Sequence, residues 1–390
     1  MMRRGLLGLL LSSSVALSAA HAACKSESGD APEELEEAGV EEAGTTKDGG
    51  GVTDGGAPDV AAPIDCSKDL QADGIFGHLA CTGLYGDFAA KAVAADVKPY
   101  APALELWSDG AEKSRWIHLP PGTKIDTSDF DEWYFPVGTK TWKEFKLGGK
   151  RIETRLFFKD KDGWKHTSYR WNDTETDAVR KDQGEAVPQA GKPNYQMPTV
   201  GECDVCHVGR KEPLLGFEAL SLALPGAKGA TLAALAADGL LSNPPPFTTA
   251  KLPENADDGT GGKAAPAIGW LHVNCGSCHN ANPSASAVQT GLFTLVRPSQ
   301  LAADAGVEDL DVWKTGVNQA STRTDPDAGT PFVRIAGGRP EASLVAILSG
   351  RRVAASEGPN PTVQMPPLVS RAVDENGQKK LTDWITVVPP

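Results

Sequence analysis

Several common signatures of function are missing from the 390 residues. After the first two dozen residues no stretch approaches about eighteen consecutive apolar residues, so no later segment is expected to span a membrane. No basic stripe with interleaved aromatic residues occurs, which argues against nucleic-acid binding. The serine hydrolase elbow, the phosphate loop and the dinucleotide fingerprint are missing as well. Hydrolases of that type and nucleotide-dependent enzymes therefore have no support.

Residues 1–23 have the pattern of a secretory signal peptide. A basic start and a short apolar run lead to Ala20-His21-Ala22, which suits ordinary cleavage. Cys24 follows closely and offers a second processing route as a lipid-acceptor cysteine, although His21 stands where such motifs usually carry an aliphatic residue. Both routes predict export in a Gram-negative type of bacterium, with the protein either periplasmic or anchored to the outer membrane through Cys24.

Residues 24–64 are predicted to be a disordered linker. From Lys25 to Ala62 the chain has no aromatic residue and holds eleven acidic and two basic residues. Such a composition does not build a packed core. Most of the net charge of −13 therefore belongs to this segment and says little about partners.

The next segment, 65–196, holds six of the nine tryptophans. Runs rich in aromatic and β-branched residues are separated by "PPGT", "LGGK" and "KDKDGW", which supply turns. The predicted strands are 114–119, 141–147, 151–158 and 164–171. We expect a compact, mostly antiparallel β domain here.

The most specific motif occurs twice, as "CDVCH" at 203–207 and "CGSCH" at 275–279. Both match Cys-x-x-Cys-His, the attachment signature of c-type haem. On a helical turn, residues three and four apart share a face, so two thiols reach the haem vinyl groups while the histidine reaches the iron. The sequence predicts two covalent haems c. Their attachment and iron-binding residues are Cys203, Cys206 and His207 for the first, and Cys275, Cys278 and His279 for the second.

The alternative for these four cysteines is a pair of disulfides or a zinc site. The gap from Cys206 to Cys275 far exceeds the roughly 15 to 20 residues of a zinc ribbon. The seven cysteines then divide into four thioethers, Cys24, and the pair Cys66 and Cys81. In an oxidising compartment that pair is expected to form a disulfide, the alternative being two free thiols.

A haem iron usually takes Met or His as its sixth ligand. Met365 in "VQMPPL" is expected to ligate the second haem, its alternative role being that of a core gap-filler. Met197, six residues before Cys203, is a weaker candidate for the first haem. The competing histidines are His78, His118, His166 and His272. The sixth ligand of the first haem is thus left undecided, and an open position would permit ligand binding or catalysis.

After Met197 the pattern turns helical and rich in loops, with helical spacing of apolar residues at 230–242, 343–350 and 373–388. We divide this part into a first haem-binding segment and a second cytochrome c-like domain. Their bounds are 197–255 and 256–390. The predicted fold class is a multidomain protein, in which a mostly antiparallel β N-terminal domain is followed by an α-helical, cytochrome c-like haem-binding region.

The chain resembles a family of exported bacterial diheme c-type cytochromes. The matching strings are "ELWSDGAEKSRWIHLPPGTKI", "FPVGTKTWKEFKL", "ETRLFF", "SYRWNDTETDA", "CDVCH", "LHVNCGSCHN" and "QMPPL", which cover most of residues 100–386. The resemblance implies a Trp-rich β N-terminal region followed by the two haem sites given above, without a firmly assigned reaction. The family usually carries an aromatic residue where this chain has Met197.

The leading hypothesis is electron transfer through two covalently bound haems, with a redox partner protein or the quinol pool as partner and no catalytic side chain assigned. Met365 would give the second haem a relatively high reduction potential. One alternative is a diheme oxidoreductase, similar to an oxidase or peroxidase, with one open haem site. The other is a non-catalytic haem-containing sensor or binding module.

Overall fold

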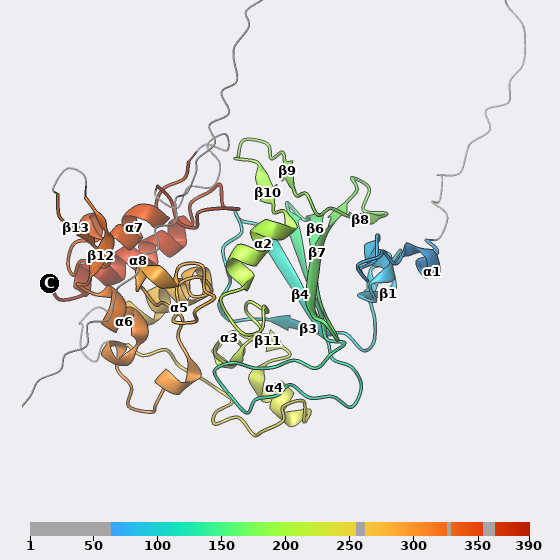
Figure 1. Ribbon diagram of the computed structural model, residues 1–390, viewed down its shortest axis with the longest axis horizontal. Helices are drawn as coiled ribbons and strands as arrows, with labels where there is room; N and C mark the ends of the chain where they lie inside the picture. The colour runs from blue at the N-terminus through green and yellow to red at the C-terminus, as the bar shows by residue number, and fades with distance from the viewer. Residues whose placement is uncertain (1–63, 255–261, 326–328, 354–362) are drawn as a thin grey trace, which may run out of the picture. The chain divides into compact units, whose positions relative to one another are not determined.

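An antiparallel sheet of seven strands dominates the computed structural model (Figure 1). The structure describes residues 64–254, 262–325, 329–353 and 363–390, which belong to one compact unit. The predicted signal peptide, Cys24 and all but the last residue of the predicted linker lie outside the described residues. In spatial order the strands are β11 (Lys228–Gly229), β3 (Lys98–Ala101), β4 (Glu112–His118), β5 (Lys140–Leu147), β6 (Lys150–Asp160), β7 (Gly163–Trp171) and β8 (Ala178–Arg180).

Strands β4 to β7 form a meander because each is followed by a segment that reverses the chain. Gly148 and Gly149 join β5 to β6 with φ of 56° and 80°, the left-handed pair that a two-residue hairpin turn requires. The four strands predicted from the alternating patterns agree with β4, β5, β6 and β7. The antiparallel β character of this part of the chain is therefore correct.

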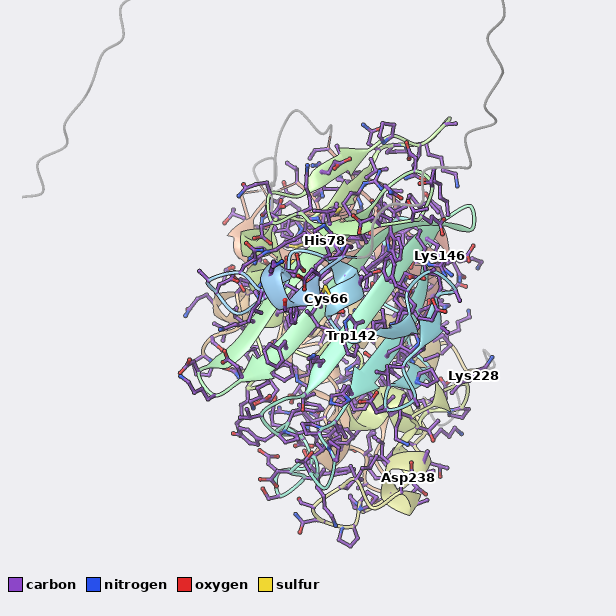
Figure 2. All side chains as sticks on the ribbon, turned by 90° about the vertical axis from the view of Figure 1, so that its right-hand side faces the viewer. Cys66, His78, Trp142, Lys146, Lys228 and Asp238 are labelled. Carbon is purple, nitrogen blue, oxygen red and sulfur yellow. A yellow bond between two sulfur atoms is a disulfide. The ribbon has the colours of Figure 1, made fainter. Side chains whose placement is uncertain are left out.

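One face of the sheet is covered by the segment before β3. This segment contains α1 (Cys66–Asp69), β1 (Tyr85–Asp87) and β2 (Ala92–Val93). It packs on Trp142, which is buried and whose Nε1 donates to Thr82 Oγ1 at 3.1 Å. Figure 2 shows Cys66 in front of the sheet, on the side from which Trp142 is seen.

The other face of the sheet contacts elements that follow β8 in the chain. Ile117 and Phe157 project from it into a core shared with Phe217. The covering elements are β9 (Glu185–Val187), β10 (Tyr195–Met197), α2 (Val200–His207), α3 (Ala219–Ala223) and α4 (Leu232–Ala237). This second face is the one on which the first Cys-x-x-Cys-His motif lies.

A second core forms where α5 (Ala264–Cys275) packs on α8 (Glu375–Val387). Leu381, Trp384 and Ile385 of α8 are fully buried, as the helical spacing of these residues predicts. The remaining α-helices and strands are α6 (Asp311–Gly316), α7 (Leu344–Ser349), β12 (Ala320–Thr324) and β13 (Pro331–Val333), and short 3-10 helices occupy Leu79–Cys81, Val288–Thr290, Pro298–Gln300, Val307–Asp309 and Pro340–Ala342. Within the described ranges no helix has the length and apolar character needed to cross a bilayer.

The predicted α-helical, cytochrome c-like region is wrong. After Met197 the described residues contain short helices separated by long loops, and only α5 and α8 exceed eight residues. The Ala- and Leu-rich run at 230–242 forms a helix only over α4, because Gly239 adopts φ +66 just past its end. The residues directly before α4 form β11 and pair with β3. The protein is mostly an antiparallel β structure, and this region contributes a strand to its sheet.

Cys66 and Cys81 form a disulfide, the pair that the cysteine count singles out. It closes a loop with a sequence separation of 15 residues. We expect the double variant Cys66→Ser/Cys81→Ser to lose about 3 kcal/mol of unfolding free energy, because the open loop has more freedom in the unfolded chain. Thermal unfolding with and without reductant checks this. A reductant that lowers the wild-type midpoint should leave that of the variant unchanged, and equal midpoints for both proteins would contradict the prediction.

Candidate functional site

The first motif occupies helix α2. Thr199 caps the helix by accepting from the Glu202 backbone N–H at 3.1 Å, and the Glu202 carboxylate accepts from the Thr199 N–H at 2.9 Å. Cys203, Cys206 and His207 follow within the same two turns, with His207 as the last helical residue. The capping box therefore fixes the start of the helix that presents both thiols and the imidazole.

The second motif straddles the end of α5. Cys275 is the last residue of the helix, and the Cys278 and His279 amides donate to its carbonyl oxygen at 3.1 and 2.8 Å. These bonds continue the helical turn through the motif. As in α2, the two cysteines and the histidine are thus held on one local turn of backbone, as the spacing of the motif requires.

Both motif histidines use Nδ1 for a hydrogen bond inside the protein. His207 Nδ1 donates to the Pro213 carbonyl oxygen at 2.5 Å. His279 Nδ1 lies 3.2 Å from Thr290 Oγ1, whose own proton goes to the Ala287 carbonyl oxygen, so the threonine oxygen accepts. The proton on Nδ1 leaves Nε2 as the basic nitrogen, the arrangement that orients a histidine for binding a metal.

Both imidazoles are also kept neutral. Burial lowers the pKa of His207 to about 3 and that of His279 to about 4, because desolvation disfavours the charged ring. His207 additionally stacks on Phe157, with the ring centroids 4.5 Å apart. A neutral imidazole with Nε2 available is the form that coordinates haem iron.

The two motifs contact each other although 72 residues separate corresponding positions in the sequence. Cys278 Sγ lies 3.6 Å from the Val205 carbonyl oxygen, and Ser284 Oγ donates to the Val208 carbonyl oxygen at 2.7 Å. A Cβ added to Gly209 would lie 1.7 Å from the Ser277 carbonyl oxygen. We call this contact, made by residues 205–209 and 277–284, the motif interface. Only glycine permits so close an approach of the two backbones.

All four motif cysteines are unpaired thiols. Burial raises the pKa of Cys203 to about 11 and that of Cys275 to about 12. Cys206 donates to Cys278 across the motif interface, which raises the pKa of the Cys206 thiol and lowers that of Cys278. The thiols are therefore not joined in the disulfides that the alternative interpretation requires.

The donors fit a haem c better than a zinc ion. In the part of the chain that the structure describes, no three His, Cys, Asp or Glu side chains gather into a group that could hold a metal ion. A structural zinc site needs four such donors. A covalent haem needs two free thiols and one imidazole with an available Nε2, and each motif offers that set.

Met365 lies in a loop whose backbone is held by hydrogen bonds. Its amide donates to the Leu348 carbonyl oxygen at 2.9 Å, and its carbonyl accepts from Arg352 Nη1 at 3.2 Å. The neighbouring Gln364 is almost fully buried and its side chain bonds to the backbone on both sides. The assignment of Met365 as the sixth ligand of the second haem stays a prediction, because axial ligands lie on opposite sides of a haem and do not contact each other directly.

The other sixth-ligand candidates have partners of their own. Met197 is fully buried in a core with Phe145 and Tyr195. His272 Nδ1 accepts from the Val296 amide, and its Nε2 faces the Glu218 carboxylate at 3.4 Å. Each of the remaining histidines lies against an aspartate; the pairs are His78 with Asp69, His118 with Asp96 and His166 with Asp204. No competing histidine is thus left without an interaction.

A row of cations that was not predicted from the sequence lies on the sheet face beneath α2. Lys143 of β5 is directly opposite Arg115 of β4 and Arg155 of β6 in the strand registers. A signal was present, because each cation is two residues from a buried apolar residue of the same strand, such as Phe145 or Phe157. That period of two places the cations on the interior side.

No family model, no curated protein and no solved structure matches the chain. The function is therefore inferred from the geometry of the two motifs and of the residues around them.

Proposed function

We propose that the protein is an exported diheme c-type cytochrome that transfers electrons through two haems attached at the two motifs. The observation that carries the proposal is the motif interface, where the chain segments bearing the two attachment sites contact each other. Two haems attached to these contacting segments would exchange electrons directly, without a mobile carrier. A redox partner protein or the quinol pool would supply or accept those electrons.

Each residue of the motifs has a defined task in this proposal. Cys203 and Cys206 would hold the first haem by thioether bonds and Cys275 and Cys278 the second. His207 and His279 would offer Nε2 to the irons, and the Pro213 carbonyl and the Thr290 hydroxyl fix the ring orientations. When bound, a haem supplies one-electron chemistry whose reduction potential the protein tunes through ligand, charge and burial.

The proposed sixth ligand of the second haem is Met365, and its tightly bonded loop supports this role because Gln364 limits the freedom of the backbone there. Replacing Met365 by His is expected to lower the reduction potential of the second haem, since a thioether ligand favours the reduced iron. A spectroscopic redox titration measures this, with the first haem as internal reference. An unchanged second potential would remove Met365 from the ligand set.

The enzyme alternative is distinguished by ligand binding. An electron carrier with both irons six-coordinate is expected to be low-spin at rest and to show no spectral change from cyanide binding when cyanide is added. Cyanide binding at one haem, together with high-spin features in the resting spectrum, would instead favour an oxidase or peroxidase. Both measurements use the mature full-length chain.

A further inference from the structure

The cation row gathers more positive charge than its neighbours neutralise. Arg115 Nη1 lies 3.1 Å from Glu105, and Lys113, two residues earlier on the same face, lies 3.8 Å from that same carboxylate. Arg155 pairs with Glu153 at 2.5 Å. The side chain of Lys143, between the two arginines, makes no hydrogen bond or ion pair with any residue the structure describes.

Arg115, Lys143, Arg155 and the neighbouring Lys113 are four cations, and only two carboxylates in the described part of the chain lie at ion-pair distance from any of them. Lys113 and Arg115 share Glu105, and Arg155 pairs with Glu153, which also accepts from the Tyr195 hydroxyl at 2.6 Å. Asp374 acts on Lys113 as well, without forming an ion pair with it. Burial and the neighbouring arginines hold the pKa of Lys143 well below its usual value. An ammonium group that is partly removed from water and has no partner is costly, so such a cluster is suited to binding an anion.

The row lies beside the first motif. The charges of Lys143 and Arg155 both act on His207, and that of Arg155 also acts on Cys203. Phe157, on which His207 stacks, follows Arg155 by two residues on the same face of β6. Lys143 and Arg155 are both half-buried rather than fully buried, so an incoming group has access to them.

We propose that Lys143, with Arg115 and Arg155 on either side, binds the propionate carboxylates of the haem attached at Cys203 and Cys206. A haem carries two propionates, which match the two cations left over in the count. This inference rests on the proposed function. In this arrangement the carboxylates of the first haem point toward the sheet. The cations on the second face of the sheet would then influence the reduction potential of that haem.

The test is a redox titration of the full-length mature chain carrying Lys143→Met. Losing the cation is expected to favour the oxidised haem, because a nearby positive charge disfavours the more positive iron. The expected shift in the reduction equilibrium of the first haem is about tenfold, or about 59 mV for a one-electron couple. Lys143→Arg keeps the charge and should keep the wild-type value. Parallel titrations of the Cys275→Ala/Cys278→Ala chain identify the haem whose reduction potential shifts.

Lys146→Met is the matched control. Lys146 is on the same strand as Lys143, and Figure 2 shows Lys146 on the side from which Trp142 is seen. It pairs at 3.3 Å with Glu144, whose bond to Tyr85 places it on the face of the sheet opposite to the cation row. This variant should leave the reduction potential of the first haem unchanged. If Lys143→Met does not mature, maturation of Lys143→Arg supports the need for a charge here, and failure of both argues against it. Unchanged potentials in a chain carrying two haems overturn the inference alone, whereas a wild-type chain without haem overturns the proposed function.

Discussion

Two covalent haems per chain are expected when the full-length protein matures in a host with cytochrome c assembly machinery. Each motif offers two unpaired thiols on one helical turn and a neutral histidine whose Nδ1 is already bonded. The pyridine haemochrome spectrum, referred to protein concentration, gives the number directly. Two haems would support the proposed function at both sites.

Paired substitutions assign each haem to its motif. Cys203→Ala/Cys206→Ala and Cys275→Ala/Cys278→Ala should each remove one haem, and the combination of both should remove all covalent haem. Cys66→Ser/Cys81→Ser is the control, because those sulfurs already form a disulfide and its loss should leave the haem count at two. A wild-type chain without covalent haem would contradict the cytochrome proposal, and the four motif cysteines would then need another role.

Gly209→Ala is expected to have the second large effect, on both stability and electron exchange. The added Cβ would lie 1.7 Å from the Ser277 carbonyl oxygen and 2.9 Å from its carbon, so the backbone itself must shift. Overpacking of this kind costs about 3 kcal/mol of unfolding free energy. Separating the motif interface should also slow electron transfer between the haems. Urea unfolding and pulse radiolysis measure the two effects.

Gly201→Ala is the matched control, because Gly201 lies in α2, which ends two residues before Gly209, and a Cβ added at Gly201 would have no neighbouring atom within 4 Å. Replacing a helical glycine by alanine without steric conflict is expected to raise the free energy of unfolding by about 0.5 to 1 kcal/mol. The two substitutions should thus change stability in opposite directions. If Gly209→Ala is as stable as Gly201→Ala, the close approach at the motif interface does not exist in solution.

The spacing of residues in the sequence correctly predicted the strands and the helix face that depend on residues close together in the chain. Alternating residues located β4 to β7, and the helical spacing of Leu381, Trp384 and Ile385 located the buried face of α8. The Cys-x-x-Cys-His spacing predicted that each set of donors would share one turn, and each does. These features depend on neighbours within a few residues of one another, which a single sequence displays directly.

Features that depend on contacts between residues far apart in the sequence could not be predicted from residue spacing. The helical region was predicted wrongly because the composition after Met197 favours helices, whereas β11 forms through pairing with β3. The row of Arg115, Lys143 and Arg155 requires the register of three strands to be known at once. The motif interface likewise depends on how two separate helices pack.

Strand β11 also covers part of the sheet edge. Lys228 and Gly229 pair with Ala101 and Tyr100, and a Cβ on Gly229 would lie 2.1 Å from the Pro99 carbonyl oxygen. Without this cover β3 would be the edge strand, with unpaired backbone groups that another chain can join. A fragment cut off before Lys228 would retain β3 to β8 and lose that protection. The residues from Lys228 onward thus cover part of β3, and the two-residue strand β11 takes its place as the edge of the sheet.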